Sequence, residues 1–434
     1  MRFSKLFLMG WLLAASFFAR EPLRGQRSVV LKPQEATWWC WAASASMILD
    51  AFGKSVSQSE QAENLFGVRN CASTYCQGGH TKRACNQGGF PQFYKYGLDA
   101  EILPSLKAFE WSDLRTDLAC EPIAFAAENR DQAGTLTGDG HMVVITGAKF
   151  LNSLELGPWL SISDPEAVLQ SSTGPCKALE RAWTYREYRA KAAWIHYYGF
   201  RSSEQKYESC KIDDEQRKKL NAELAYSFNL PESFDPGALV KGLIARLQPD
   251  ASSDPAAIEE ARWLRKSSGL KDQSHLDCDF EHGIQQEEIS IATLQDEKSG
   301  YRLEEILFDV DRQRFICTEN DWKKQGEFSI EVARNQETKS WHLASIGDGA
   351  LASAINEGKS RPGFRDAKDI HEVRVQGLNF RFLRVPTDQD AGILELSPEE
   401  ALGNDFKNRE SKDGKTLLFR LRAAAATFLA SGPS

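Results

Sequence analysis

Four residues of this sequence have the types and positions needed for nucleophilic attack on a carbonyl group. Cys40 stands at the predicted start of a helix, in "QEATWWCWAAS", where the helix macrodipole and free N–H groups favour a thiolate. His141 opens an apolar strand in "GDGHMVVITGA" and is placed to act as the base, and Asp164 ends the apolar segment "PWLSISDP", where it would orient the imidazole. Gln34, six residues before Cys40, has an amide that would hold the oxyanion together with the Cys40 N–H. These residues predict acyl transfer through a thioester.

Each of these residues also has a simpler interpretation. Cys40 would be half of a disulfide, the common state of an exported cysteine. His141 would be a hydrogen-bonded residue at a strand end, Asp164 would only end a strand in an Asp-Pro turn, and Gln34 would be a surface amide. His80 is a rival base, although no strand follows it. The joint pattern favours the catalytic interpretation over these separate ones.

The order and spacing of the four residues resemble the papain-like cysteine peptidases. Members carry a glutamine, then Cys-Trp at a helix start, then a histidine opening a strand and Asn or Asp after the following strand; "CWAAS" and the spacing of six match. "CNQGGFPQFYKYGL" is similar to the family's Cys-Asn-Gly-Gly segment, which implies that Gly88 and Gly89 hold a peptide backbone, with Trp41 beside them. The proline after Asp164 is closer to the bacteriocin-processing and secreted-effector branches. The resemblance covers about residues 28–200.

The sequence also departs from this family. Thr37 stands where members often have a second cysteine, and Trp38 and Trp39 replace small residues, which would narrow the cleft. The resemblance implies hydrolysis of a peptide or protein substrate without a cofactor or a metal ion. Two other interpretations stay open: an acyltransferase or amidase with the same triad, and a non-catalytic peptide-binding module on a peptidase scaffold.

Nine cysteines in an exported chain leave one unpaired, and the arithmetic favours Cys40 as that free thiol. Cys278 with Cys317 is the expected bridge of the C-terminal part. Four possible zinc ligands fall in one segment: Cys71, Cys76, His80 and Cys85. Their spacing does not match a common zinc finger, so disulfides are the preferred interpretation there.

The first 19 residues predict an export signal, with Arg2 and Lys5 before an apolar run and small residues after it. That run is too short for a membrane span, and no later stretch is apolar enough, so we expect a secreted or periplasmic protein with no stable membrane span. The chain has a net charge of −8 and contains no basic run, which argues against nucleic-acid binding.

The chain length predicts more than one domain. We expect an α+β fold, with a papain-like domain at residues 28–205, made of a helical half and an antiparallel sheet half, followed by a second α+β domain at 212–434. In the first domain the patterns predict helices at 40–52 and 57–66, two short helices within 88–119, and strands at 122–128, 141–151, 158–165, 181–189 and 192–200. In the second they predict helices over 212–270 and mainly strands over 285–434, including hairpins at 328–343 and 371–385. No chemical motif is evident past residue 212.

Overall fold

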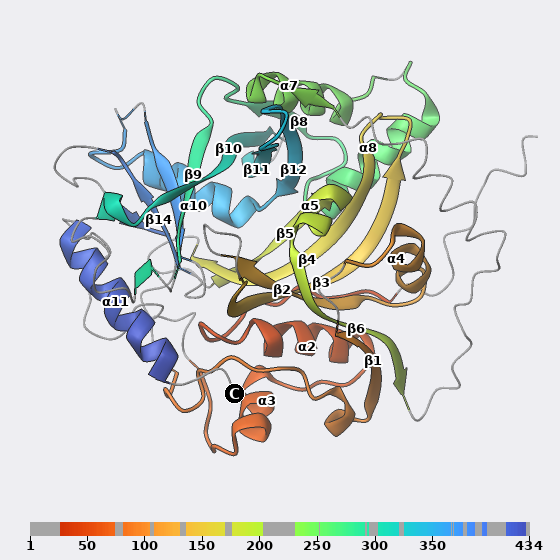
Figure 1. Cartoon of the computed structure of the whole chain (residues 1–434). Coiled ribbons are helices and arrows are strands. Elements are labelled where there is room, and N and C mark those ends of the chain that lie inside the picture. The colour runs from red at the N-terminus through yellow and green to blue at the C-terminus, as the bar shows by residue number, and fades with distance from the viewer. Residues whose placement is uncertain are drawn as a thin grey trace, which may run out of the picture.

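The computed structural model describes the chain from Arg27 to Ala430 with gaps (Figure 1). The described residues are 27–73, 81–104, 108–130, 136–169, 176–202, 231–250, 252–290, 293–294, 303–320, 325–365, 367, 369–375, 380–386, 393–396 and 414–430. The expected export signal, residues 1–19, and the expected helical stretch at 213–230 lie outside them. Within these ranges no helix has the length and apolar character needed to cross a membrane.

One mixed sheet runs through the whole described chain. Its strands follow the order β1-β6-β2-β3-β4-β5-β12-β11-β10-β9-β13-β14-β15, with β7 beside β12 and β8 beside β10. The pairings are antiparallel except for that of β9 with β13. In its first half the strands are β1 (Leu98–Pro104), β2 (Ile123–Arg130), β3 (Leu136–Leu151), β4 (Gly157–Leu169), β5 (Cys176–Thr184) and β6 (Ala192–Ser202).

The second half of the sheet is built from later segments of the chain. Its strands are β7 (Glu232–Ser233), β8 (His275–Cys278), β9 (Ile284–Ile289), β10 (Phe308–Asn320), β11 (Gln325–Arg334), β12 (Trp341–Gly347), β13 (His371–Val375), β14 (Phe380–Arg384) and β15 (Ile393–Glu395). The two halves meet where β5 pairs with β12, Trp183 opposite Ser345 and Arg181 opposite Gly347. Both expected hairpins are present, as β11 with β12 and β13 with β14.

Helices cover the sheet on both sides of this junction. The N-terminal part has α2 (Cys40–Ala51), α3 (Gln58–Phe66), the 3-10 turn η3 (Phe93–Tyr96), α4 (Trp111–Leu118) and α5 (Tyr185–Ala190). The C-terminal part has α7 (Pro236–Leu247), α8 (Pro255–Ser267), η4 (Leu303–Glu305), α10 (Gly349–Lys359) and α11 (Gly414–Ala430). Figure 1 shows α2 lying along β2 and β3. Helix α7 contacts the second half of the sheet, α8 contacts β3, β4 and β5 of the first half, and α10 contacts strands of both halves.

The local sequence accounts for the helix that holds the candidate nucleophile. From Cys40 to Leu49 every residue of α2 is buried, because alanine, methionine and leucine on all sides pack against β2, β3 and β4. Gly53 adopts a φ of 73° directly after the helix, a conformation that glycine reaches without strain. The helix is therefore a fixed core element rather than a surface element.

The structure differs from the sequence expectation at two places. The segment expected as one strand at 181–189 is strand only to Thr184, and the chain then turns into α5, where the Thr184 hydroxyl accepts a hydrogen bond from the Glu187 N–H. Two helices, α10 and α11, also fall within the range expected to be mainly strands.

The junction of the two halves is packed as well as hydrogen-bonded. Side chains of α7, α8 and β12 share one hydrophobic core with side chains of β4 and β5, including Leu243, Leu264, Ile346, Trp159 and Ala182. The fold is thus mixed α and β, with a large sheet that continues across the region where the sequence suggested a domain boundary.

Candidate active site

Cys40 is the first residue of α2, and the aromatic residues before it fix that end of the helix. Trp39 is fully buried and donates its indole N–H to the Cys85 carbonyl at 2.7 Å, while the Trp38 N–H donates to Asn86 Oδ1 at 3.1 Å. The first N–H groups of an α-helix have no partner within the helix, so they lie beside the thiol. Among the described residues Cys40 is the free cysteine, and its side chain is 8% exposed.

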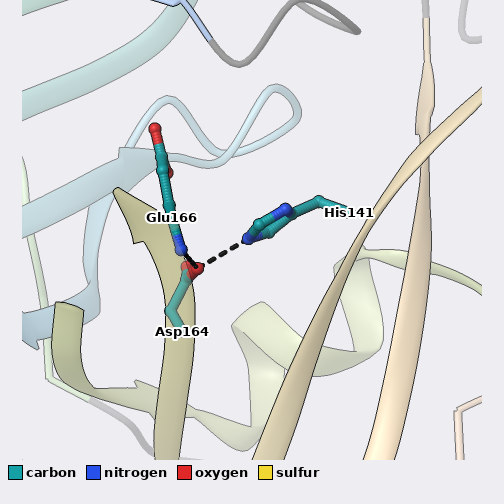
Figure 2. A group of neighbouring side chains, drawn as sticks. All are labelled: His141, Asp164 and Glu166. Carbon is teal, nitrogen blue, oxygen red and sulfur yellow. Dashed lines mark hydrogen bonds and ion pairs between the residues drawn. The ribbon is translucent and has the colours of Figure 1, made fainter. Parts of the chain in front are cut away.

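His141 and Asp164 meet across neighbouring strands. Antiparallel pairing of β3 with β4 brings the two residues to the same end of the sheet. The His141 Nε2 lies 2.6 Å from Asp164 Oδ1, and the same oxygen accepts a hydrogen bond from the Glu166 N–H at 2.9 Å (Figure 2). The structure therefore brings together the predicted base and the predicted orienting carboxylate.

The helix of Cys40 is tied to the strand of His141. One turn into α2, the Ser44 hydroxyl donates to the Met142 carbonyl at 3.0 Å, and Met142 is the residue after His141. Cys40 lies close enough to His141 to favour the imidazolium electrostatically, and among the described residues His141 Nδ1 has no hydrogen-bond partner. Because Nε2 is occupied by Asp164, the ring is oriented with Nδ1 available to the sulfur.

The charges around the imidazole stabilise its protonated form. Burial alone would lower the pKa of His141, but the charge and hydrogen bond of Asp164, with a contribution from Cys40, raise that pKa to about 10. Burial alone would raise the pKa of Asp164, whereas His141 and Arg181 hold it well below its ordinary value. A protonated imidazole beside a thiol favours the thiolate, which is the reactive form.

Gln34 lies next to this group but is held by other contacts. Its backbone N–H donates to the Pro165 carbonyl at 2.8 Å, which joins the segment before α2 to the segment after Asp164. Its side-chain Nε2 donates to the Thr37 carbonyl at 2.8 Å, and the residue is 1% exposed. An amide nitrogen carries two hydrogens, and the Thr37 carbonyl accepts one of them.

The residues predicted to line a substrate cleft have different surroundings. Trp41 is buried, donates its indole N–H to the Gln87 carbonyl at 3.3 Å and packs edge-on against Phe66. Gly89 is pressed against the same indole, since a Cβ there would lie 3.0 Å from Trp41 Cε2. A Cβ on Gly88 would meet nothing within 4 Å. Trp41 and Gly89 thus hold the segment in place, and Gly88 has open space beside it.

Arg181 was not singled out from the sequence, yet it extends the site into the C-terminal part of the chain. Its Nη2 lies 3.2 Å from Asp164 Oδ2, and its Nε lies 2.8 Å from Asp348 Oδ1. Arg181 belongs to β5, and Asp348 follows β12, so the pairing of these two strands brings the residues together. A sequence pattern does not reveal this contact, because it depends on the tertiary pairing.

Glu166, two residues after Asp164, is bound by a second arginine. Arg381 of β14 places Nε 2.6 Å and Nη2 3.0 Å from the two carboxylate oxygens of Glu166, across a separation of 215 residues. Arg381 also donates to Glu372, which in turn accepts from Arg314. Buried charges are tolerated when they are paired and hydrogen-bonded in this way. The His141–Asp164 pair therefore rests on an ion-pair network supplied largely by β10, β13 and β14.

A cavity of about 270 Å³ lies against this network and against His141. Both parts of the chain line it. The N-terminal part contributes Ala127, His141, Val143, Asp164, Glu166, Arg181, Trp183, Glu187, Ala190 and Lys191, and the C-terminal part contributes Gln286, Glu288, Val310, Arg312, Arg314, Glu331, Ser345, Arg374 and Arg381. The residues of the second part are therefore placed to contact whatever occupies the space beside the imidazole.

His141, Asp164 and Glu166 also have the donor types of a metal site, with ligand atoms within 4.8 Å of one another (Figure 2). The atoms that face one another here already have protein partners. His141 bonds Asp164, and Glu166 is held through both oxygens by Arg381. A divalent cation would have to displace a guanidinium and would face the Arg181 charge, so this donor set fits an arginine network better than a metal ion.

The structure also places the candidate zinc ligands and other cysteines and histidines of the sequence. Cys71 and Cys85 form a disulfide, which removes two of the four candidate zinc ligands; Cys76 and His80 lie outside the described residues. Cys278 and Cys317 are bonded as expected. His196 is fully buried, hydrogen-bonded to the Tyr188 hydroxyl at 2.8 Å and stacked on Phe125, so it is a residue of the core.

Comparison with known proteins gives one family match, over the region that carries this site. Residues 26–191 match the family model described as the Peptidase_C39 like family. This match supports a papain-like cysteine peptidase region over those residues. No curated protein and no solved structure matches the chain.

Proposed function

We propose that this protein is an exported cysteine peptidase that hydrolyses peptide bonds through Cys40, His141 and Asp164. The family match supports cysteine peptidase activity in general. The observation that carries the proposal for this chain is the bond of His141 Nε2 to Asp164. It leaves Nδ1 without a hydrogen-bond partner among the described residues, on a ring that the free thiol of Cys40 influences electrostatically. Disulfides at Cys71–Cys85 and Cys278–Cys317 fit export to an oxidising compartment.

The proposed reaction begins with the proton of the thiol on His141. The Cys40 sulfur attacks the peptide carbonyl carbon, and the C=O electrons move onto oxygen. The N–H of Cys40 and the side-chain amide of Gln34 donate to that oxyanion. As the carbonyl re-forms, the C–N bond breaks, and the imidazolium of His141 gives its proton to the leaving nitrogen.

Water completes the cycle. It attacks the thioester carbon while His141 accepts one of its protons, the C–S bond breaks, and the acid product leaves. Asp164 touches neither substrate nor water in this scheme. It keeps the imidazole in one orientation and stabilises its positive charge, as a triad carboxylate does. Arg181 has no direct contact with the reaction and is a positioning residue for Asp164.

The experiment that tests this proposal is alkylation of the full chain with iodoacetamide, followed by peptide mapping. We expect selective labelling of Cys40 near pH 6, where an ordinary thiol is unreactive, and loss of that labelling in His141→Ala. His282→Ala, which changes an exposed histidine of the C-terminal part, is the matched control and should label as the wild type does. Equal, slow labelling of all three proteins would overturn the proposal.

Product analysis then separates hydrolysis from the other interpretations. A peptide library is incubated with wild type and with Cys40→Ala, with and without an added primary amine. Free acid products in the wild type alone support the peptidase. Amide products that replace the acids would assign the site to acyl transfer, and peptide binding without any turnover would assign it to a binding module.

A further inference from the structure

We propose that the cavity beside His141 binds a carboxylate of the substrate on the leaving-group side of the scissile bond, with Arg374 as the principal contact. This inference rests on the proposed peptidase function, because it assigns a substrate feature to that site. The expected ligand is a peptide whose residues after the scissile bond carry an acidic side chain or the free C-terminal carboxylate.

Arg374 is a charged residue of the cavity wall, and no described residue forms an ion pair with it at 4 Å or less. It lies on β13 and is half-buried. Its charge lowers the pKa of Glu166. Within the described residues, however, no carboxylate lies within 4 Å of it and no acceptor takes its hydrogen bonds, whereas Arg312, Arg314 and Arg381 of the same wall are each paired with glutamates.

The strand register adds an unfavourable electrostatic interaction at Arg374. Arg374 stands directly opposite Arg381 on β14, and like charges opposite one another destabilise a sheet. Glu288 is its register neighbour on β9 and lines the same cavity, but takes part in other interactions and is not paired with it. An anion in the cavity would offset the repulsion between the two guanidiniums.

Gln286 provides a second, independent donor on the same wall. Gln286 is 8% exposed and lines the cavity, and its Nε2 has no hydrogen-bond partner in the part of the chain that the structure describes. Gln286 and Glu288 alternate along β9 with residues of the opposite face, and pair in register with Glu372 and Arg374. The Gln286 amide and the Arg374 guanidinium are therefore diagonal neighbours on one face, and both are donors that a carboxylate accepts.

The place of the cavity decides which part of the substrate it meets. Its wall contains His141 but not Cys40. In the proposed reaction His141 protonates the leaving nitrogen, so the residues that follow the scissile bond extend from the imidazole. A volume of about 270 Å³ lies just below the range of roughly 300–1,000 Å³ typical of small-ligand pockets, and fits one or two residues.

Binding of leaving-group mimics tests this inference without any catalytic step. The full chain is titrated by calorimetry with four peptides that carry a free amine: Ala-Glu-amide, Ala-Gln-amide, Ala-Ala and Ala-Ala-amide. We expect at least tenfold tighter binding by a member that carries a carboxylate than by its amide counterpart. The first pair detects an acidic side chain, and the second detects a free C-terminus.

Substitutions test whether residues of the cavity wall cause the preference for a carboxylate. Arg374→Gln should bring acid and amide peptides to parity, Arg374→Glu should favour Ala-Lys-amide over Ala-Glu-amide, and Gln286→Leu should weaken acid binding several-fold. Arg262→Gln, on the exposed face of α8, is the control and should keep the preference. Thermal unfolding of each variant shows that it is folded.

Wild type that binds acids no better than amides, or a preference that survives Arg374→Gln, would overturn the inference. Failure of the peptidase proposal is seen separately. In that case Cys40 labels slowly and no peptide is cleaved, whatever the titrations give.

Discussion

Asp348, the residue before α10, pairs with Arg181 of β5 at 2.8 Å, and the same guanidinium reaches Asp164 at 3.2 Å. The orienting carboxylate of the N-terminal region is thus held by a residue of the C-terminal part. Burial raises the pKa of Asp348, opposed by Arg181 and Arg314, so its negative charge depends on these two arginines. The C-terminal part is therefore a structural component of the candidate active site.

Replacement of Asp348 by asparagine should affect both stability and turnover. It leaves the buried Arg181 without a charged partner on one side, which should lower the free energy of unfolding by about 3 kcal/mol. Loss of orientation at Asp164 should lower kcat by about 10- to 100-fold with little change in KM. Urea unfolding and steady-state kinetics measure the two effects. Asp254→Asn, at the exposed N-cap of α8, should change neither. Wild-type kcat in Asp348→Asn would contradict the positioning role of this pair.

Glu121 should make the protein less stable as pH rises from about 4.5 to about 7. Its side chain is buried, and burial raises its pKa to about 7, although the Phe200 N–H donates to it at 2.7 Å. The folded state then binds more protons than the unfolded state between about pH 4.5 and 7, so the stabilisation present below pH 4.5 is lost toward pH 7, by roughly 3 kcal/mol. Glu121→Gln keeps the Phe200 bond and should remove this dependence. Parallel curves of stability against pH for the wild type and Glu121→Gln would contradict this role of Glu121.

The Cys278–Cys317 disulfide should contribute more to stability than the Cys71–Cys85 disulfide. It closes a loop with a sequence separation of 39, against 14 for the other bridge. Loop-closure entropy then predicts losses of about 4 and about 3 kcal/mol for the respective double alanine variants. Denaturant unfolding measures both. A larger loss for the shorter loop would show that native contacts of the bridges, rather than chain entropy, dominate.

Two adjacent glycines should respond differently to alanine. In Gly89→Ala the new Cβ would lie 2.4 Å from Leu65 Cδ2 and against the Trp41 ring, so we expect a loss of about 1–3 kcal/mol in unfolding free energy. Gly88→Ala has open space and should stay within about 0.5 kcal/mol of wild type. The family resemblance implies that Gly88 holds the peptide backbone of the substrate, so its alanine variant should raise KM. Thermal unfolding and peptide kinetics separate the two effects.

Local sequence signals predicted the elements that hold Cys40, His141 and Asp164. Helix α2 follows from its run of apolar helix formers, and β3 and β4 follow from β-branched runs that end in turns. The sequence also contains a signal for α5, because Thr184 and Glu187 have the Thr-x-x-Glu spacing of a helix start, and the Glu187 N–H donates to the Thr184 hydroxyl. The aromatic residues of this segment favour a strand and obscure that signal.

The ion-pair network could not be predicted in this way. Arg381 and Glu166 are 215 residues apart, and each looks like a surface charge when the sequence is taken alone. They become buried only because β14 and β4 belong to the same sheet. The same tertiary dependence hid Arg181, whose role appears only when β5 pairs with β12.

The β5–β12 pairing also determines how the chain can be divided. A fragment that stopped at Ser202 would leave β5 as an open rim of backbone donors and acceptors, with Trp159 and Ala182 uncovered where α7 and α8 now pack. An unpaired edge strand of this kind can pair with other chains and promotes aggregation. The N-terminal region is therefore a poor candidate for excision as an autonomous enzyme, and a truncation made there would fail through insolubility before its chemistry was tested.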